Sequence, residues 1–385
     1  MGVHAKLSAS GAKRWMTCTP SAELENQFPE STSTYAEEGT FAHELGELMI
    51  RYNLGEIKKR KFNSEFKKLQ ENQYYNEELQ EYVEAYVNQV WEFVNEAKVN
   101  CSDAIVMLEQ RLDFSEWVPE GFGTGDCVII ADGQLHIIDL KFGKGVGVVA
   151  EDNPQLRLYA LGALREFELL YDIQTVKMTI IQPRLDNTTS SELTVEELID
   201  WADRYVTPKA QLAMDGKGEF VAGEHCRFCK ARETCRARAE KNLELTKHEF
   251  AKPELLEPSE IGDILKVAGQ LQDWVKDIQA YALQQALEGK RFDGWKLVEG
   301  RSTRKYSDEI AVAETLKSKG YDEAIIYSKE LLGITAMEKA IGKKVFAEIL
   351  GELIIKPEGK PTLVVESDKR PELKTAESAA ADFLE

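Results

Sequence analysis

Two carboxylates and a lysine lie close together near the middle of the chain. Asp139 and Lys141 are two residues apart, and Asp126 lies thirteen residues before Asp139. Side chains two apart on a strand point to the same face, so we expect Asp139 and Lys141 to share one. Carboxylates are the ligands that Mg²⁺ prefers, and a lysine beside such a cation would orient a water or contact a phosphate. This chemistry suits hydrolysis of a phosphodiester bond.

A surface hairpin with ordinary charges would show the same Asp-x-Lys spacing. Two features favour a chemical site. Asp139 ends the run Leu135-His136-Ile137-Ile138, which we interpret as a buried strand. Burying a charge there costs free energy, so it is expected only where the charge has a function. Downstream, Gln155 and Tyr159 are four residues apart, so they would lie on one face of a helix.

Three further cysteines form a Cys-x₂-Cys-x₅-Cys group: Cys226, Cys229 and Cys235. A tetrahedral Zn²⁺ or a [4Fe–4S] cluster needs a fourth ligand, for which Cys18 and His225 are the candidates. The spacing leaves zinc and iron–sulfur open. Cys101 and Cys127 stand apart, and we interpret them as small hydrophobic residues.

The net charge of −19 argues against a protein that coats nucleic acid, but two segments are basic. The first comprises Lys58, Lys59, Arg60, Lys61, Lys67 and Lys68. The second, interleaved with the cysteines, comprises Arg227, Lys230, Arg232, Arg236, Arg238 and Lys241. The first is either a solvated helix face or a binding surface. In the second we expect phosphate contacts from Arg227, Lys230 and Arg232.

The elements that must position these residues alternate between helix and strand. Hydrophobic spacing predicts helices over 39–50, 75–97 and 195–214, and strands over 105–112, 125–130, 135–141 and 176–182. Asp132-Gly133 predicts a hairpin turn, and Asn153-Pro154 predicts a helix start. This order predicts an α/β (α+β) core with a mixed central sheet flanked by helices.

After about residue 245 the pattern changes. We expect a domain over 1–245, a helical accessory region over 246–365 and a disordered acidic tail over 366–385. The accessory region would hold a long helix over 259–288 and a hairpin over 295–306 with Gly300 in its turn. No run of eighteen apolar residues, signal segment or Walker A motif is present, so we expect a cytoplasmic protein without its own ATP motor.

Four segments together resemble RecB-type nucleases of the PD-(D/E)XK superfamily. Three are Gly123-Thr124-Gly125-Asp126, Ile138-Asp139-Leu140-Lys141-Phe142-Gly143 and Gln155-Leu156-Arg157-Leu158-Tyr159-Ala160. Upstream, Glu38-Gly39-Thr40-Phe41-Ala42-His43 is similar to the first motif of that family, whose histidine binds metal. The resemblance covers about residues 8–240. It implies a restriction-endonuclease-like core of the PD-(D/E)XK type.

The resemblance also implies roles for single residues. His43, Asp126 and Asp139 would bind Mg²⁺ or Mn²⁺, and Lys141 would be the catalytic lysine. Gln155 and Tyr159 would complete the catalytic site or contact DNA. Asp139 stands where Glu is commoner, which leaves metal binding intact. Glu109 lies where some members carry an additional acid; an exposed strand residue is the alternative.

Some RecB-type nucleases carry one cysteine before the core and a Cys-x₂-Cys-x₅-Cys group after it, which together hold a [4Fe–4S] cluster. This chain has the same order, with Cys18 before the motifs and the triplet after them. The resemblance therefore implies an iron–sulfur cluster on Cys18, Cys226, Cys229 and Cys235, with zinc as the alternative. Joining segments about two hundred residues apart would stabilise the fold.

As a whole, the chain is similar to a phage or prophage family of this nuclease class, including in the segments 359–363 and 366–371. This similarity implies a DNA exonuclease that resects DNA ends in recombination or repair in a bacterial host cell. DNA would be its substrate, and a single-strand annealing or single-strand-binding protein its partner. Two alternatives stay open: a nuclease acting on RNA or branched DNA, and a non-enzymatic, zinc-stabilised module that binds DNA or protein.

Overall fold

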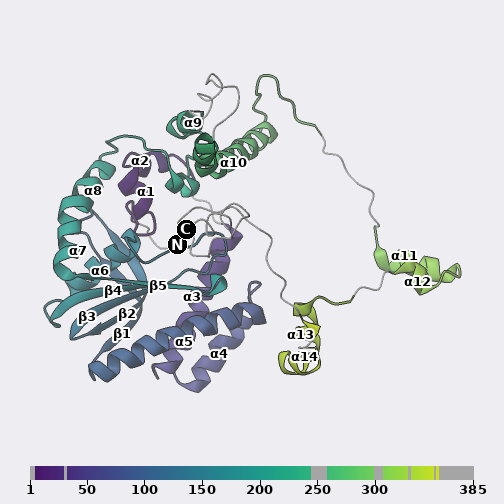
Figure 1. Ribbon diagram of the computed structural model, residues 1–385, viewed down its shortest axis with the longest axis horizontal. Coiled ribbons are helices and arrows are strands. Elements are labelled where there is room, and N and C mark those ends of the chain that lie inside the picture. The colour runs from purple at the N-terminus through teal and green to yellow at the C-terminus, as the bar shows by residue number, and fades with distance from the viewer. Residues whose placement is uncertain are drawn as a thin grey trace, which may run out of the picture. The chain divides into compact units, whose positions relative to one another are not determined.

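The computed structural model describes residues 5–29, 33–243, 258–298, 307–327, 331–350 and 353–354. The chain divides into two units, Met1–Gln285 and Ala286–Glu385. The first unit holds the sheet (Figure 1) and also contains the candidate site and the cysteines. The domain boundary expected at residue 245 stays a prediction.

The first unit is built on one five-stranded mixed sheet whose strands lie in chain order (Figure 1). They are β1 (Ile105–Asp113), β2 (Phe122–Ala131), β3 (Gly133–Leu140), β4 (Ile173–Gln182) and β5 (Asn187–Thr194). β3 and β4 pair in parallel, and every other neighbouring pair is antiparallel. The crossover between β3 and β4 is made by helix α6 (Pro154–Phe167).

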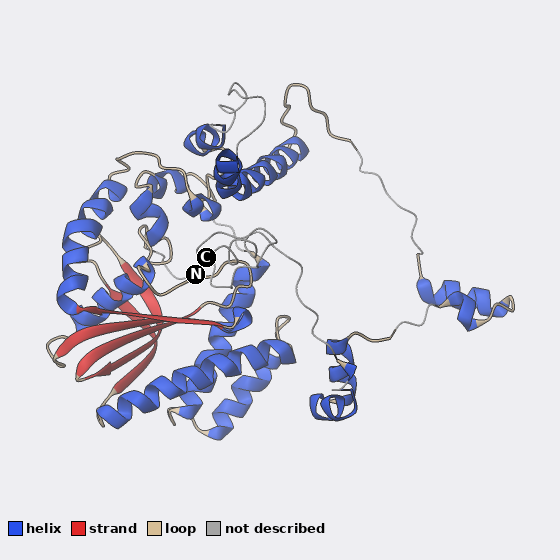
Figure 2. Ribbon diagram, in the orientation of Figure 1, coloured by secondary structure: helices blue, strands red, loops and turns tan. Residues whose placement is uncertain are grey.

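Helices cover both faces of this sheet (Figure 2). One layer contains α1 (Ala12–Thr17), α6, α7 (Val195–Trp201) and α8 (Thr207–Met214); the other contains α3 (Thr34–Asn53) and α5 (Glu77–Asn100). Successive β2 residues alternate between the two cores, with Val128 and Ile130 facing the first and Cys127 and Ile129 the second. Because both faces are covered, β3 is buried from Leu135 to Leu140, and this explains why most of its residues are apolar on both faces.

The predicted α/β core with a mixed sheet is confirmed, and so are its hairpin and crossover helix. Ala131 pairs with Gln134 across the turn, where Gly133 has φ +84°, a backbone conformation that favours glycine. At the start of α6 the Asn153 side chain accepts hydrogen bonds from the backbone N–H groups of Gln155 and Leu156.

Two features differ from the sequence-based expectation. β5 was not predicted because its side chains are mostly hydroxyls at an exposed sheet edge. The single helix expected over 195–214 is interrupted by a π-helical segment, η2 (Ala202–Val206), between α7 and α8. Helix α4 (Lys59–Gln70), which follows Lys58 and carries the rest of the first basic cluster, has no buried residue and so agrees with a solvated helix face.

The remaining described elements are short, apart from one helix. They are α2 (Ser21–Glu25), η1 (Pro183–Leu185), η3 (Glu224–Phe228), α9 (Arg236–Leu243), α10 (Pro258–Leu287), α11 (Glu309–Ser318), α12 (Glu323–Ile326), α13 (Ile334–Ile341) and α14 (Lys343–Leu350). α10 confirms the predicted long helix. None of the described helices is long and apolar enough to cross a membrane.

The hairpin expected over 295–306 is not formed in its described part, since residues 295–298 have no strand structure. Residues 299–306, which include Gly300, lie outside the described residues, as does the predicted tail over 366–385.

Candidate active site and cysteine cavity

The end of β3 carries a buried ion pair between Asp139 and Lys141. The Lys141 Nζ lies 2.8 Å from Asp139 Oδ2, and Asp139 is only 2% exposed. Parallel pairing with β4 fixes the backbone at Lys141, because its N–H donates to the carbonyl of Ile181. Burial raises the pKa of Asp139, and the charge of Lys141 opposes that rise. A buried carboxylate is therefore kept beside a fixed cation at the end of the sheet.

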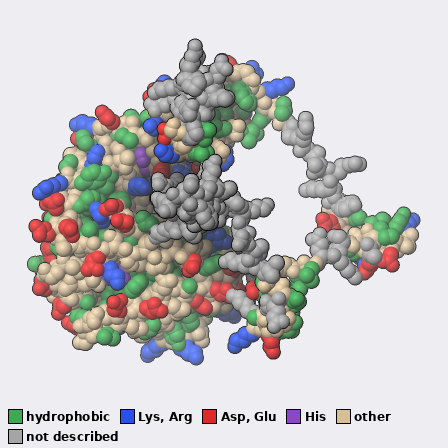
Figure 3. Space-filling model, viewed as in Figure 1, with side chains coloured by type: hydrophobic (Ala, Val, Ile, Leu, Met, Phe, Trp, Pro, Cys, Tyr) green, Lys and Arg blue, Asp and Glu red, His purple; other side chains and the backbone are tan. Residues whose placement is uncertain are grey.

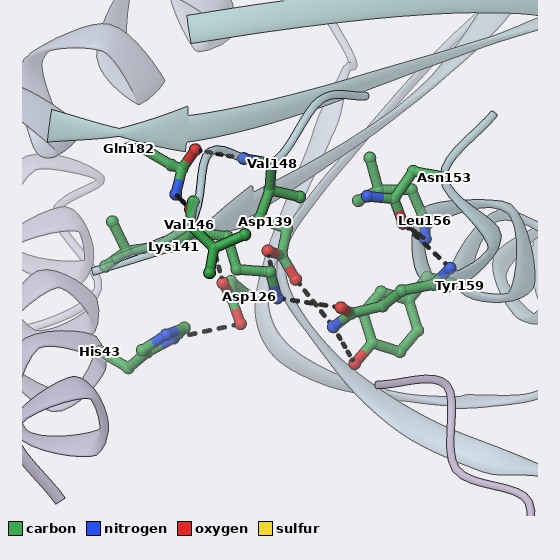
Figure 4. Close-up of polar contacts among 12 residues, drawn as sticks. His43, Asp126, Asp139, Lys141, Val146, Val148, Asn153, Leu156, Tyr159 and Gln182 are labelled. Atoms are coloured by element: carbon green, nitrogen blue, oxygen red, sulfur yellow. Dashed lines mark hydrogen bonds and ion pairs between the residues drawn. The ribbon is translucent and has the colours of Figure 1, made fainter. Parts of the chain in front are cut away.

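Gln155 joins this pair to the crossover helix. Its side-chain Nε2 donates to Asp139 Oδ1 over 3.1 Å, and its Oε1 accepts from Lys141 Nζ over 2.9 Å. The same Nε2 lies 3.1 Å from the hydroxyl of Tyr159, one turn along α6. Gly123 leaves room for that ring, because a Cβ at this position would lie 2.6 Å from Tyr159 Cε1. The close-up in Figure 4 shows these contacts converging between α6 and β3.

Asp126 links β2 to both β3 and helix α3. Its Oδ2 accepts from the backbone N–H of Leu140 over 2.7 Å, and its Oδ1 lies 3.2 Å from His43 Nδ1 (Figure 4). Burial lowers the pKa of His43, but Asp126, Asp139 and Glu109 together outweigh burial and raise it to about 9. The protonated ring is thus stabilised by nearby carboxylates and would exchange its proton for a bound cation.

Glu109 completes a compact ligand group. Ligand atoms of His43, Glu109 and Asp126 all lie within 4.8 Å of one another. Glu109 is exposed on β1, as the alternative of an exposed strand residue expected, yet it belongs to this group. Desolvation and the Asp126 carboxylate raise its pKa to about 7. Its backbone has φ +50° in the middle of β1, which is unfavourable for a residue other than glycine. Strain of this kind persists at functional positions, so the placement of this carboxylate indicates a role.

The donor atoms at this end of the sheet fit a hard divalent cation. Carboxylate oxygens with one imidazole nitrogen suit Mg²⁺ or Mn²⁺. Asp139 lies beside this group, and its buried Oδ2 forms the ion pair with Lys141. The candidates His43, Asp126, Asp139, Lys141, Gln155 and Tyr159 are thus brought together from α3, β2, the end of β3 and α6.

Gln182 supports the site, although no sequence motif includes it. It is 1% exposed at the end of β4. Its Oε1 accepts from the Val148 N–H over 2.7 Å, and its Nε2 donates to the Val146 carbonyl over 3.0 Å (Figure 4). This clamp holds the loop that runs from Lys141 to α6. A polar residue ending the apolar run of β4 is the signal that could have found it.

All four candidate cluster cysteines line one small cavity. Its wall includes Cys18, Cys226, Cys229, Cys235 and His225, together with Arg14, Ser21, Leu24, Phe220, Val221, Arg232, Ala237 and Arg238. Cys18 follows α1, whereas the triplet lies more than two hundred residues later, so the fold brings the two together. His225 lines the same cavity and remains a rival fourth ligand.

The thiols that line this cavity are candidate ligands for either metal centre, because thiolates hold both tetrahedral zinc and [4Fe–4S] clusters. Burial raises the pKa of Cys229 to about 11, so its thiolate would need a metal partner.

Protein contacts also tie the two halves of this cavity. Arg14 pairs with Glu25 at 2.8 Å and donates to the carbonyl of Phe228 over 3.1 Å. The Glu25 Oε1 accepts from the backbone N–H of Lys230 over 2.8 Å. The Cys226 sulfur accepts from the Gly223 N–H at 3.4 Å, a contact that favours the thiolate form.

The three predicted phosphate contacts lie in different settings. Arg232 forms ion pairs with Glu233 and Asp277, so its charge is already neutralised within the protein. Lys230 is half-buried beside the cavity. Arg227 is exposed and lies 6.0 Å from the centroid of the Phe228 ring.

Residues 4–371 match a family model described as "Protein of unknown function (DUF2800)". A solved structure titled "Crystal structure of SSO0001" matches 59% of this chain and 96% of its own length, with 14% sequence identity and a TM-score of 0.22.

Proposed function

Since the chain belongs to the family described as Protein of unknown function (DUF2800), we propose its activity from the site: a metal-dependent deoxyribonuclease of the RecB type. The observation that carries this proposal is the convergence of Asp139, Lys141 and Gln155 beside the ligand group of His43, Glu109 and Asp126. No structural role requires that a buried carboxylate, a lysine and three further potential ligands meet at one sheet end.

Each side chain has a distinct part in the proposed reaction. Lys141, held by Asp139 and Gln155, would present a fixed positive charge to the phosphate and orient the attacking water. Tyr159, hydrogen-bonded to Gln155, keeps the amide turned towards that pair. The preorganised charges would act without rearrangement during hydrolysis.

Mg²⁺ or Mn²⁺ would be held by His43, Asp126 and Asp139, with Glu109 as an additional ligand. When bound, the cation supplies Lewis-acid stabilisation of the charge that grows on the phosphate. The residues prepare for it: Asp126 is oriented by the N–H of Leu140, and His43 by Asp126.

We further propose that Cys18, Cys226, Cys229 and Cys235 hold a [4Fe–4S] cluster with a structural role. The cavity that these four cysteines line together supports it. Such a centre would fasten the N-terminal helix α1 to the segment after α8 and so close the first unit.

The test is digestion of end-labelled DNA, single- and double-stranded, with Mn²⁺ or Mg²⁺. We expect shortening of labelled DNA that stops when the metal is chelated and is lost in Asp126→Asn, with an RNA strand of the same sequence left intact. Absence of cleavage on every DNA end with either metal would exclude this function. Cleavage confined to RNA would replace it with a ribonuclease.

A further inference from the structure

A groove of about 650 Å³ lies next to the cysteine cavity, in the first unit. Its lining comes from the chain around α1, the loop after β3, the segment around η3, and helices α9 and α10: Ser10, Lys13, Arg14, Val146, Gly147, Ala222, Gly223, Glu224, His225, Arg227, Phe228, Arg238, Lys241, Asn242, Leu265, Lys266, Gly269, Gln270 and Asp273. In the space-filling view, blue Lys and Arg side chains and purple His atoms border a hollow below α9 and α10, the two helices at the top of the first unit (Figure 3).

The charge of this groove is opposite to that of the chain. Six basic side chains line it against two acidic ones, whereas the whole chain has a net charge of −19. Such a local reversal concentrates positive potential along one path and favours a polyanion as occupant.

The basic side chains of the groove are not equally available. Arg14 pairs with Glu25, and Arg238 pairs with Asp277. Arg227 is exposed and, among the described residues, has no carboxylate within ion-pair distance. Its guanidinium is therefore free to bind a phosphate.

Beside Arg227 the groove presents an aromatic ring to solvent. Phe228 is 64% exposed, although its backbone is fixed by the hydrogen bond from Arg14 to its carbonyl. An exposed apolar ring next to a free guanidinium is the pairing on which unpaired bases stack while phosphates are held. Bases inside a duplex are stacked on one another and offer no free face to such a ring. This feature favours a single strand.

The groove also leads to the candidate active site. Val146 and Gly147, which line it, belong to the loop that follows Lys141 and is clamped by Gln182. Val146 is five positions after Lys141, so their Cα atoms lie within about 18 Å of each other. The wall of the groove at Val146 is therefore no further than this from Lys141.

We propose that this groove binds one strand of DNA, with Phe228 stacking on a base and Arg227 holding a phosphate, and guides that strand to Lys141. The inference rests on the proposed deoxyribonuclease function and names its substrate class as single-stranded DNA. Because η3 carries both Cys226 and Phe228, the groove also depends on the cysteine cavity for its shape.

The test measures binding apart from cleavage. Fluorescence anisotropy of a labelled twenty-nucleotide DNA strand, and of its duplex, is followed with the full chain and no added divalent cation. We expect the single strand to bind at least about tenfold more tightly than the duplex. Phe228→Ala should weaken single-strand binding about tenfold or more, and Phe228→Trp should restore it. Arg227→Ala should weaken binding and reduce its salt dependence.

Matched controls lie outside the groove. Tyr205→Ala removes another exposed aromatic ring, 43% exposed on η2, and Arg204→Ala removes another exposed guanidinium; neither should change binding. Unchanged binding in Phe228→Ala, or tighter binding of the duplex, would overturn the groove assignment even if the enzyme cleaves DNA. Phe228-dependent single-strand binding without cleavage at any DNA end would leave the groove standing and reject the nuclease.

Discussion

The Lys141 ammonium donates to Gln155 Oε1 over 2.9 Å and thereby joins the end of β3 to the first turn of α6. The two residues are fourteen positions apart and are connected by the loop that Gln182 clamps. Because Gln155 also donates to Asp139, the amide fixes both charges of the buried pair at once. Lys141 therefore has one orientation before any substrate arrives, which is what electrostatic preorganisation requires.

Lys141→Ala should lower the rate of DNA cleavage at least about 100-fold, because a fixed positive charge next to the phosphate is lost. Initial rates with Mn²⁺ on end-labelled DNA measure it. Lys144→Ala, three residues further along the same loop and exposed, is the matched control and should keep the wild-type rate. Equal rates in wild type and Lys141→Ala, with equal thermal stability, would remove Lys141 from the chemistry.

Two substitutions of Glu109 can distinguish its effect on metal binding from its effect on stability. Both Glu109→Gln and Glu109→Gly remove a carboxylate from the group with His43 and Asp126, so each should weaken Mn²⁺ binding about tenfold. Glycine adopts the local φ of +50° without strain, whereas glutamine does not. The free energy of unfolding of Glu109→Gly should therefore exceed that of Glu109→Gln by about 1 kcal/mol, so the glycine variant is the more stable.

Titration calorimetry with Mn²⁺ and chemical unfolding of the two variants measure both effects. Glu92→Gln, on the exposed face of α5, is the control for loss of one carboxylate. Wild-type Mn²⁺ affinity in both Glu109 variants would show that this carboxylate is not a ligand.

Much of this arrangement was predictable because it depends on local signals. The apolar run 135–138 marks β3, Asp132-Gly133 marks its turn, and Asn153-Pro154 marks the start of α6. Once these elements are placed, alternation along the strand and one helical turn bring Asp139, Lys141, Gln155 and Tyr159 to one end of the sheet.

Other features depend on contacts between distant segments and could not be predicted. β5 is an edge strand whose hydroxyl side chains carry no apolar alternation. The αL backbone of Glu109 and the clamp of Gln182 arise from tertiary packing, which no local motif encodes. The groove combines five segments of the chain. The ion pairs of Asp277 with Arg232, beside the cysteines, and with Arg238, in the groove, likewise join segments far apart in the sequence.

The fourth ligand of the cysteine cavity can be identified directly. Cys18→Ala should lose iron and the broad absorption near 400 nm expected of a [4Fe–4S] cluster, and its unfolding temperature should fall by several degrees, because α1 would no longer be joined to the triplet. His225→Ala should keep the iron. Cys101→Ala is the matched cysteine control and should also keep the iron. Cys101 is buried outside this cavity, and its thiol donates a hydrogen bond to Asp103.

Iron content by elemental analysis and the visible spectrum of freshly purified protein measure these outcomes. A Cys18→Ala protein with full iron content and an iron-free His225→Ala protein would reverse the ligand assignment. Colourless wild-type protein that contains one equivalent of zinc would instead establish the smaller metal centre.

A buried histidine in the sheet should make stability depend on pH independently of the metal ligands. His136 on β3 is 5% exposed, and its Nε2 lies 2.8 Å from Thr179 Oγ1 on β4. Burial and the charge of Lys177 lower the pKa of His136 to about 3. Between this value and the ordinary pKa of about 6.5, the unfolded chain binds the proton and the folded chain does not.

The contribution of His136 to stability is therefore complete above about pH 6.5 and is lost as the pH falls towards 3. Between pH 7 and pH 5, this single group should lower the free energy of unfolding by about 2 kcal/mol. His136→Gln retains a side chain that can hydrogen-bond to Thr179 but does not titrate, so its loss of stability over the same interval should be smaller by that amount. Chemical unfolding at both pH values, followed by tryptophan fluorescence, gives the difference. Parallel pH profiles for wild type and variant would mean that His136 is protonated, or accessible to protons, in the folded protein.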